Sequence, residues 1–313
     1  MDYKSIILSS LETLRQKELS EKQIFKAKAY ATVISQIKSI DSIKSFEDLK
    51  DVTGIGKKIE EKLKEIFSTG ELASAKRAEE SVKPFQLLTT VYGIGPTKAK
   101  ELVKSGITSI EELRKASQDD ESLLTEVQTI GLKYYEDLQL RIPFKEMQMH
   151  ERFLKKNIPK EIQSDIVGSY RRNLESSGDI DLLLQSNNSK DLDDLVSKLI
   201  EKGYLTNILA YGKHKLMGIC KLPKKPYRRI DILLTPISEY PFALLYFTGS
   251  NLFNIAMRSY ASTLGYTLNE KGLIKDKKRI TSITSEKDIF DVLRLKYKEP
   301  SQRKDSSSIE LIT

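Results

Sequence analysis

Gly168-Ser169-Tyr170-Arg171-Arg172, followed after a short spacer by Asp179-Ile180-Asp181, is the stretch that decides the fold of this chain. In a β-strand, successive side chains point to opposite faces, so the two aspartates project from one face and the isoleucine between them from the other. The glycine and serine favour a turn that holds phosphate, and the arginines add positive charge beside it. A phosphate-binding turn next to paired carboxylates is typical of a metal-dependent nucleotidyl-transfer site.

A second strand-like run, Arg228-Arg229-Ile230-Asp231-Ile232-Leu233-Leu234, places another carboxylate beside the first pair. Taken singly, each aspartate is compatible with an ordinary surface or turn position. Together they predict a site for two Mg²⁺ ions about 3.5–4 Å apart, with Mn²⁺ as a substitute, that clamp the attacking and leaving oxygens of an in-line displacement. We predict that Asp179 and Asp181 bridge the metals and that Asp231 binds one of them and orients a 3′-hydroxyl. The β and γ phosphates of a nucleotide would be held by Ser169, Arg172, Ser177 and Gly178.

The composition favours a polyanionic partner in a reducing compartment. The 313 residues carry 52 Lys and Arg against 44 Asp and Glu, a formal charge of +8, although a merely basic soluble protein would share this balance. A single cysteine, Cys220, excludes an internal disulfide framework and a cysteine-rich zinc site. No signal peptide and no run of 18 apolar residues is visible. We therefore expect an intracellular protein of the nucleus, the cytoplasm or a viral factory, neither secreted nor bound to a membrane.

The order of secondary structure is all-α first and α/β later. Periodic apolar positions separated by glycine turns predict helices up to about residue 140. Apolar runs predict strands at 166–167, 180–184, 216–222 and 230–234, with a helix at 192–200 between them. Ile142-Pro143 is a plausible boundary, since a residue before proline disfavours helix. Residues 301–313 are expected to form a frayed tail.

The helical part contains an internal repeat, with Val52 to Ile59 and Val91 to Lys98 sharing the pattern apolar-x-Gly-apolar-Gly at the start of a helix. A lone Gly-x-Gly is most often an ordinary tight turn. Two copies flanked by lysines favour helix-hairpin-helix motifs, whose glycines allow close approach and whose helix starts offer free N–H groups to a DNA phosphate. Pro96 suits the first helical position.

These motifs together resemble the family X DNA polymerases, most closely those of the beta type. The resemblance rests on Gly168 to Asp181, Arg229-Ile230-Asp231, Tyr246-Phe247-Thr248-Gly249-Ser250, Phe253-Asn254 with Met257-Arg258, and Glu286 to Asp291. It implies a multidomain α and α/β protein. A helical lyase domain with the first hairpin would span 1–80, a domain with the second hairpin 81–142, a catalytic palm with a mixed sheet and helices 143–237, and a small α+β nucleotide-selection domain with the frayed tail 238–313.

The resemblance also implies how nucleotide and DNA are bound. Tyr246, Phe247 and Gly249 would lie under the sugar, Asn254 against the incoming base, and Arg258 in the template minor groove. Without it, the aromatic residues would be plain core and the last two an exposed helical pair. DNA contacts are implied for Gly54, Gly56, Lys58, Gly93, Gly95, Lys26, Tyr30 and Arg229, and a Na⁺ or K⁺ ion would be held by backbone carbonyls of Thr53, Ile55, Thr89, Val91 and Ile94.

A second active site is implied at Lys62, where beta-type enzymes carry a lysine that forms a Schiff base with a 5′-deoxyribose phosphate. Its helical position beside Ile59, Leu63 and Ile66 predicts partial desolvation, which favours the nucleophilic form of the amine. The alternative is a solvated lysine interleaved with glutamates. The helping histidine of relatives is absent, and Ser74 stands where a secondary lysine would be. Asn173 replaces a glycine in the phosphate turn, where a left-handed conformation remains tolerable, and Leu233 replaces an arginine that pairs with a metal-binding aspartate.

The sequence thus predicts a monomeric, template-directed gap-filling DNA polymerase of base excision repair with an attached lyase. Its substrates would be a dNTP and gapped or nicked DNA with a 5′-phosphate, and a DNA ligase is a candidate partner. A template-independent terminal transferase is the first alternative, although residues 205–215 leave little room for the long loop it requires. A non-catalytic DNA-binding scaffold and a lyase-only protein are the others.

Overall fold

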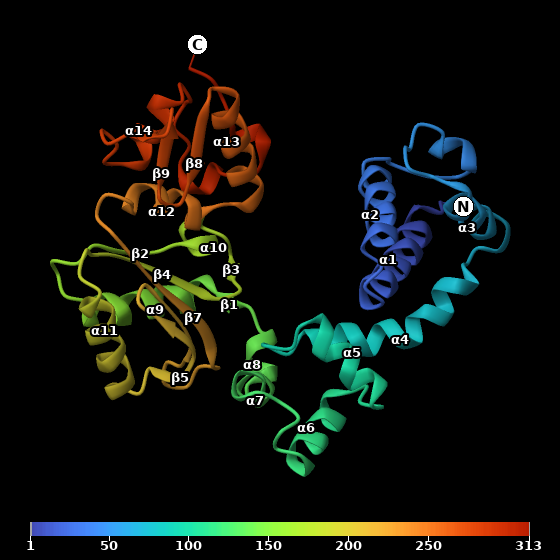
Figure 1. Cartoon of the computed structure of the whole chain (residues 1–313), viewed down its shortest axis with the longest axis horizontal. Helices are drawn as coiled ribbons and strands as arrows, with labels where there is room; N and C mark the ends of the chain where they lie inside the picture. Colours follow the sequence, from blue (N-terminus) through green and yellow to red (C-terminus); the bar gives the residue numbers. More distant parts are fainter. Residues whose placement is uncertain (1, 313) are drawn as a thin grey trace. The chain divides into compact units, whose positions relative to one another are not determined.

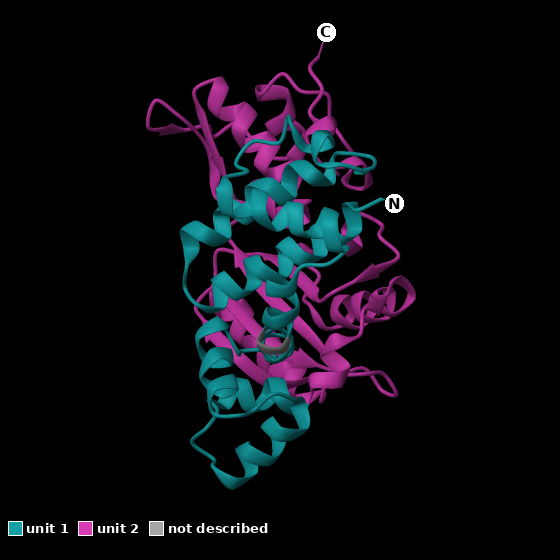
Figure 2. Ribbon diagram, turned by 90° about the vertical axis from the view of Figure 1, so that its right-hand side faces the viewer, with its two compact units in different colours: residues 1–133 teal, residues 134–313 magenta. Residues whose placement is uncertain are grey.

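The computed structural model describes residues 2–312, apart from the side chains of residues 80 and 81. The chain forms two compact units, residues 1–133 and residues 134–313 (Figure 2). Within the described residues, the first unit is helical and the second holds the strands. The expected order of an all-α part followed by α/β parts is therefore confirmed.

Unit 1 is built on α1 (Lys4–Ser20), α2 (Ile24–Lys38) and α3 (Lys57–Thr69), which bury one apolar face each. Leu11, Val33 and Leu63 meet in their shared core with no exposed surface. This burial of helix faces supplies the main stabilisation, since short helices are marginal in isolation. The remaining helices of this unit are η1 (Phe46–Leu49), α4 (Ala73–Thr89), α5 (Pro96–Lys104), α6 (Ile110–Asp119) and α7 (Glu126–Lys133).

The centre of unit 2 is a five-stranded mixed sheet in the order β2-β4-β7-β6-β5, in which β4 and β7 are parallel and the other neighbours antiparallel (Figure 1). Its strands are β2 (Ser164–Ile166), β4 (Ile180–Gln185), β5 (Leu205–Gly212), β6 (Lys215–Cys220) and β7 (Arg228–Thr235). Helices α9 (Phe144–Asn157) and α11 (Lys190–Glu201) pack on the face to which Ile180 and Ile230 point. The alternate residues Asp181 and Asp231 are left on the other face.

Shorter elements connect this sheet to its surroundings. Helix α8 (Tyr135–Gln139) precedes β1 (Ile142–Pro143), so the proposed boundary at Ile142-Pro143 is itself a strand, paired with β3 (Ser176–Ser177). Helix α10 (Gly168–Arg171) is a single turn between β2 and β3.

The C-terminal part of unit 2 is α+β, as expected. It comprises α12 (Tyr240–Thr248), α13 (Asn251–Thr263), α14 (Glu286–Val292) and a small antiparallel sheet of β8 (Tyr266–Asn269), β9 (Gly272–Lys275) and β10 (Lys278–Arg279). Phe253 and Phe290 are fully buried in its core, with ring centroids 6.2 Å apart. None of the helices within the described residues could cross a lipid bilayer, because each is too short or too polar.

The expectation of a frayed tail is wrong. Short helices η2 (Pro300–Gln302) and η3 (Ser306–Ser308) continue the chain, and Leu311 forms a bridge with Leu295. The guanidinium of Arg303 is buried and donates to Glu286 Oε1 at 2.6 Å. The tail is held by this long-range ion pair, which its polar local composition does not reveal.

Candidate active site

The phosphate turn is shaped by Gly168, whose φ is +64°. A Cβ at this position would lie 2.6 Å from Asp181 Oδ2, so only glycine fits beside the carboxylate. Ser169 Oγ donates to Ser177 Oγ at 2.9 Å across the turn. Asn173 has φ +59°, which confirms that asparagine adopts the left-handed conformation here.

The carboxylates gather at the adjoining ends of two parallel strands. Asp181 and Asp231 are direct partners in the register of β4 and β7, and Asp179 immediately precedes β4. Burial, and then the charges of Asp179 and Asp231, raise the pKa of Asp181 to about 7. The parallel register therefore concentrates negative charge at one point, as the two motifs predicted.

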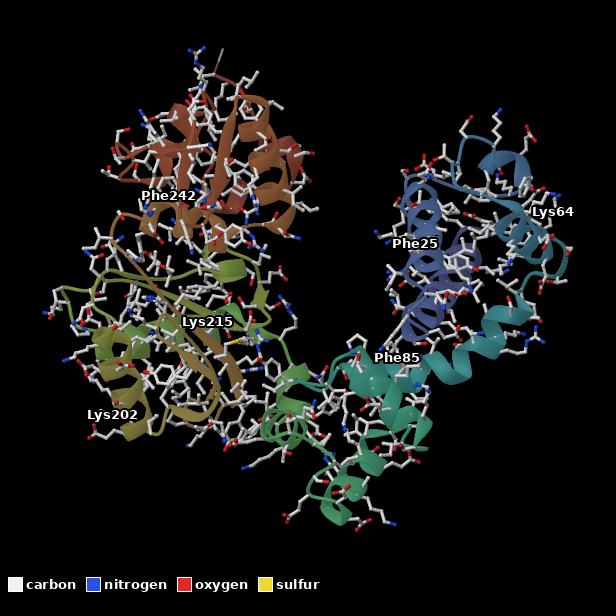
Figure 3. The ribbon with its side chains drawn as sticks, in the orientation of Figure 1. Phe25, Lys64, Phe85, Lys202, Lys215 and Phe242 are labelled. Carbon is white, nitrogen blue, oxygen red and sulfur yellow. The ribbon has the colours of Figure 1, made fainter. Side chains whose placement is uncertain are left out.

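Two cations balance this charge in the structure. Arg229 forms a salt bridge with Asp179, and Lys215 Nζ lies 2.9 Å from Asp231 Oδ2. Lys215, labelled in Figure 3, begins β6. It pairs directly with Leu233, the residue that replaces an arginine. The sequence analysis missed Lys215, and only its place at the start of an apolar strand could have drawn attention to it.

The site contains donors suited to a divalent cation. Asp231 is only 7% exposed, and its buried Oδ1 has no hydrogen-bond partner within the described residues. A buried carboxylate oxygen without a hydrogen-bond donor carries a desolvation penalty. Coordination of a hard divalent cation by this oxygen would offset that penalty. Among residues 2–312, no three His, Cys, Asp or Glu side chains are gathered closely enough to hold a metal on their own. The aspartates instead face their arginine and lysine partners.

Two residues predicted to bind the nucleotide, Arg172 and Asn254, form hydrogen bonds with the backbone of residues 246–249. Arg172 Nη1 donates to the carbonyl of Thr248 at 2.5 Å, and Asn254 Nδ2 donates to the carbonyl of Tyr246 at 2.7 Å. Burial lowers the pKa of Arg172, an effect that the charge of Asp181 opposes. Phe247 packs against an apolar cluster that includes Leu183, two residues along the strand from Asp181. Gly178 and Arg258 are exposed.

A buried ion network joins the phosphate turn to the C-terminal part. Arg171 donates to both carboxylate oxygens of Glu286, with distances of 3.0 and 2.7 Å, and Arg303 donates to one of them. Arg171 also donates to Thr248 Oγ1 at 2.7 Å. These hydrogen bonds hold the pKa of Glu286 below its usual value against the opposing effect of burial. The sequence analysis used Glu286 only as a motif residue and did not foresee this network.

The two hairpins are built alike. Gly54 and Gly93 both have φ +88°, and Gly56 and Gly95 are the N-cap residues of α3 and α5, with Pro96 in the first turn as expected. A glutamine amide from a neighbouring helix holds each turn, since Gln36 bonds the N–H and the carbonyl of Thr53 and Gln128 donates to Gly93. Among the carbonyls proposed for a monovalent ion, that of Thr53 thus already accepts from Gln36, and that of Val91 accepts from the N–H of Ile94.

Comparison with known proteins accounts for nearly the whole chain. Family models match as a helix-hairpin-helix domain over residues 4–72, the fingers domain of DNA polymerase lambda over 86–139, the DNA polymerase beta palm over 141–237 and the DNA polymerase beta thumb over 243–304. This chain belongs to the family X DNA polymerases.

Individual proteins are also similar in sequence to most of this chain. DNA polymerase lambda of Rattus norvegicus is 30% identical over 96% of this chain, and that of Arabidopsis thaliana is 30% identical over 83%. The DNA nucleotidylexotransferase of Xenopus laevis is 28% identical over 88%. The chain spans only 56%, 54% and 63% of the length of these three relatives.

Unit 1 of this family X chain also contains a pocket of about 620 Å³ around Lys62. Lys62 is half-buried beside Ile59, and its Nζ donates to the carbonyl of Lys58 at 3.2 Å. Lys26, Lys58 and Tyr30, for which DNA contacts were implied, line the same pocket, as do Gly54, Gly56 and Ser74. Residues that are distant in sequence are therefore brought together at this pocket.

Proposed function

We propose that this family X chain is a template-directed DNA polymerase that fills short gaps. It would transfer a nucleotide from a dNTP to a primer 3′-hydroxyl, with pyrophosphate leaving. The observation that carries the proposal is the register pairing of Asp181 with Asp231 beside the Gly168 turn. Such a pair of neighbouring carboxylates next to a phosphate-binding turn fits two-metal nucleotidyl transfer.

The residues would divide the work by position. Asp179, Asp181 and Asp231 would hold two divalent cations, Mg²⁺ or Mn²⁺, which when bound supply charge stabilisation at the reacting oxygens. Asp231 would orient the primer 3′-hydroxyl. Ser169, Ser177 and Arg172 would hold the triphosphate, and the segment from Tyr246 to Gly249, supported by Asn254, would form the floor under the sugar.

The hairpins would grip the DNA backbone on either side of the gap. The N-termini of α3 and α5 present backbone N–H groups suited to phosphate, with lysines beside them and a monovalent ion as a further bridge. Because such contacts release counterions, we expect DNA affinity to fall steeply with salt. A gap with a downstream 5′-phosphate, filled by a monomeric enzyme and then sealed by a DNA ligase, fits this arrangement.

Primer extension on one-nucleotide-gapped DNA, with and without the downstream 5′-phosphate, tests the polymerase proposal. Asp231→Ala should reduce extension by at least about 100-fold, because it removes a ligand needed only for the reaction. Asp194→Ala, an exposed aspartate on α11, is the matched control and should extend normally. Equal extension by wild type and Asp231→Ala would reject the proposed two-metal mechanism, whereas no extension by either protein would favour the non-catalytic scaffold.

We also propose that Lys62 forms a Schiff base with a 5′-deoxyribose phosphate and thereby starts its elimination. The half-buried amine in a pocket rich in other lysines supports this role. Borohydride should trap wild type on DNA with such a 5′ end and should not trap Lys62→Ala. Lys64→Ala, an exposed lysine on the same helix, serves as control (Figure 3). Trapping of Lys62→Ala at the wild-type level would reject this assignment.

A template-independent transferase is disfavoured by the connection between β5 and β6. Only Lys213 and His214 join the two strands, so there is no room for a long loop at this position. We expect no extension of single-stranded primers, measured beside the gapped substrate under the same conditions.

A further inference from the structure

The pocket around Lys62 carries a marked excess of positive charge. Five lysines line it, at positions 17, 26, 57, 58 and 62, and among the described lining residues Glu18 is the single carboxylate. A cationic pocket suits the phosphate of a 5′-deoxyribose phosphate. The presence of the Glu18 carboxylate in the lining of this cationic pocket needs a separate explanation.

Glu18 is poorly satisfied by the protein. Its Oε2 is buried and finds no hydrogen-bond donor in the part of the chain that the structure describes. Lys26 Nζ lies 3.7 Å from this oxygen, beyond hydrogen-bond distance, and the Lys26 side chain is 61% exposed whereas that of Glu18 is 17% exposed. A buried carboxylate oxygen with no donor from the protein has a vacant acceptor position for a group of a bound substrate.

Glu18 also faces the interior of this wall. Burial, followed by the charge of Glu18, raises the pKa of Tyr30, which is 8% exposed and lines the same pocket. The negative charge of Glu18 therefore acts on a residue that lines the pocket.

A lyase reaction at this pocket needs a base that the lysines cannot provide in their charged form. After Lys62 forms an imine with C1′ of the opened sugar and releases water, a proton must leave C2′. The two histidines of the chain, His150 and His214, both lie in unit 2. Protonated lysines can only donate, and the Tyr30 phenol is neutral near pH 7.

We propose that Glu18 is the base that removes the C2′ proton in this elimination, an inference that rests on the proposed lyase function of Lys62. The C2′–H electron pair forms the C2′=C3′ double bond while the C3′–O bond breaks. The departing oxygen stays with the downstream strand as its 5′-phosphate, and the proton resides on the Glu18 carboxylate. Water then hydrolyses the imine and frees Lys62.

Imine formation at Lys62 and the later elimination step can be measured separately. Glu18→Gln keeps the size of the side chain and removes its basicity, so borohydride trapping should stay within about twofold of wild type. Release of the sugar phosphate near neutral pH should slow by about 100-fold or more, the usual contribution of a positioned base. Glu18→Asp, which keeps a carboxylate, should recover part of the rate. Glu21→Gln and Glu61→Gln, both exposed glutamates close to the pocket residues in sequence, should release the sugar normally.

Each other outcome rejects the inference. Release at the wild-type rate by Glu18→Gln would show that another group takes the proton. An equal loss of trapping and release would show that Glu18 only positions Lys26 or stabilises the fold. Thermal unfolding of the variant would distinguish these two roles. If wild type itself is not trapped, the lyase function fails and this inference falls with it, whereas normal trapping with normal release in Glu18→Gln overturns this inference alone.

Discussion

Lys215 and Arg229 hold two of the three site carboxylates in the structure, Asp231 and Asp179 respectively. Each pair keeps a carboxylate partly neutralised at the centre of the sheet. A divalent cation that uses the same oxygens has to displace these partners. The side chain of Lys215 is 46% exposed, so its ammonium can turn to solvent at modest cost.

Lys215→Met should therefore strengthen divalent-metal binding. A half-exposed ion pair is worth about 1 kcal/mol, so removal of the competing charge should raise Mn²⁺ affinity by roughly fivefold. Electron paramagnetic resonance titration of the DNA-free protein with Mn²⁺ measures this directly. Lys213→Met, in the exposed turn just before it, is the control, and unchanged affinity in Lys215→Met would contradict the competition.

His150 makes the stability of unit 2 depend on pH. It is fully buried, its Nδ1 lies 2.7 Å from the Tyr204 hydroxyl, and burial lowers its pKa to about 4. In the unfolded chain the imidazole titrates near its ordinary value of about 6.5, so below that pH the unfolded state binds the extra proton. The stability is present above about pH 6.5 and is lost as the pH falls toward 4.

Urea unfolding should show this loss. From about pH 7.5 to about pH 5, the free energy of unfolding should fall by roughly 2 kcal/mol through this one group. His150→Gln should be less stable at the higher pH and should lose much of this pH dependence. His214→Gln, at the exposed second histidine, should retain the wild-type slope, and an identical slope in both variants would exclude His150 as the cause.

At the scale of elements, salt bridges between side chains, together with apolar packing, join the C-terminal segment to α10 and α14. Glu286 begins α14 and receives hydrogen bonds from Arg171 on α10 and from Arg303 beyond η2. Three charges are thus buried together, and removal of one leaves the others incompletely paired.

Arg303→Met should destabilise the C-terminal part of unit 2. The expected loss is about 3–5 kcal/mol, because a buried carboxylate would lose one of its two guanidinium partners. Thermal unfolding followed by circular dichroism measures it, with Lys304→Met, an exposed neighbour, as control. A change below about 1 kcal/mol in Arg303→Met would show that Arg171 alone satisfies Glu286.

At the scale of the whole molecule, the two proposed activities belong to different units. Lys62 and Glu18 lie in residues 1–133, and the three aspartates lie in residues 134–313. No residue of one proposed site is shared with the other, and each unit has its own apolar core.

The two activities should consequently be separable on one substrate. On gapped DNA that carries a 5′-deoxyribose phosphate, Asp231→Ala should lose extension and keep borohydride trapping, and Lys62→Ala should show the converse. Each variant thus serves as the control of the other. Loss of both activities in either variant would instead indicate that the units act as one catalytic body.

Local patterns in the sequence were sufficient for much of the fold and site. Apolar runs along 180–184 and 230–234 predicted two strands that carry the aspartates, and the structure confirms both strands. The glycines of the two hairpins and the left-handed Asn173 were predictable because backbone conformation depends mainly on the residue itself. Strand β5 was missed, since it is a bulged edge strand with most side chains exposed and shows no clear apolar alternation.

The tertiary structure alone decided which side chains meet. Parallel register brings Asp181 beside Asp231, and β6 brings Lys215 to the latter. Arg171 and Glu286 are 115 residues apart in the chain, and no local period encodes such a pair. Conformation is a property of neighbours in sequence, whereas ion pairs, pocket walls and orphaned oxygens such as those of Asp231 and Glu18 arise only when distant segments pack. The sequence by itself therefore determined the chemistry that the chain carries, and packing determined which groups are free to perform it.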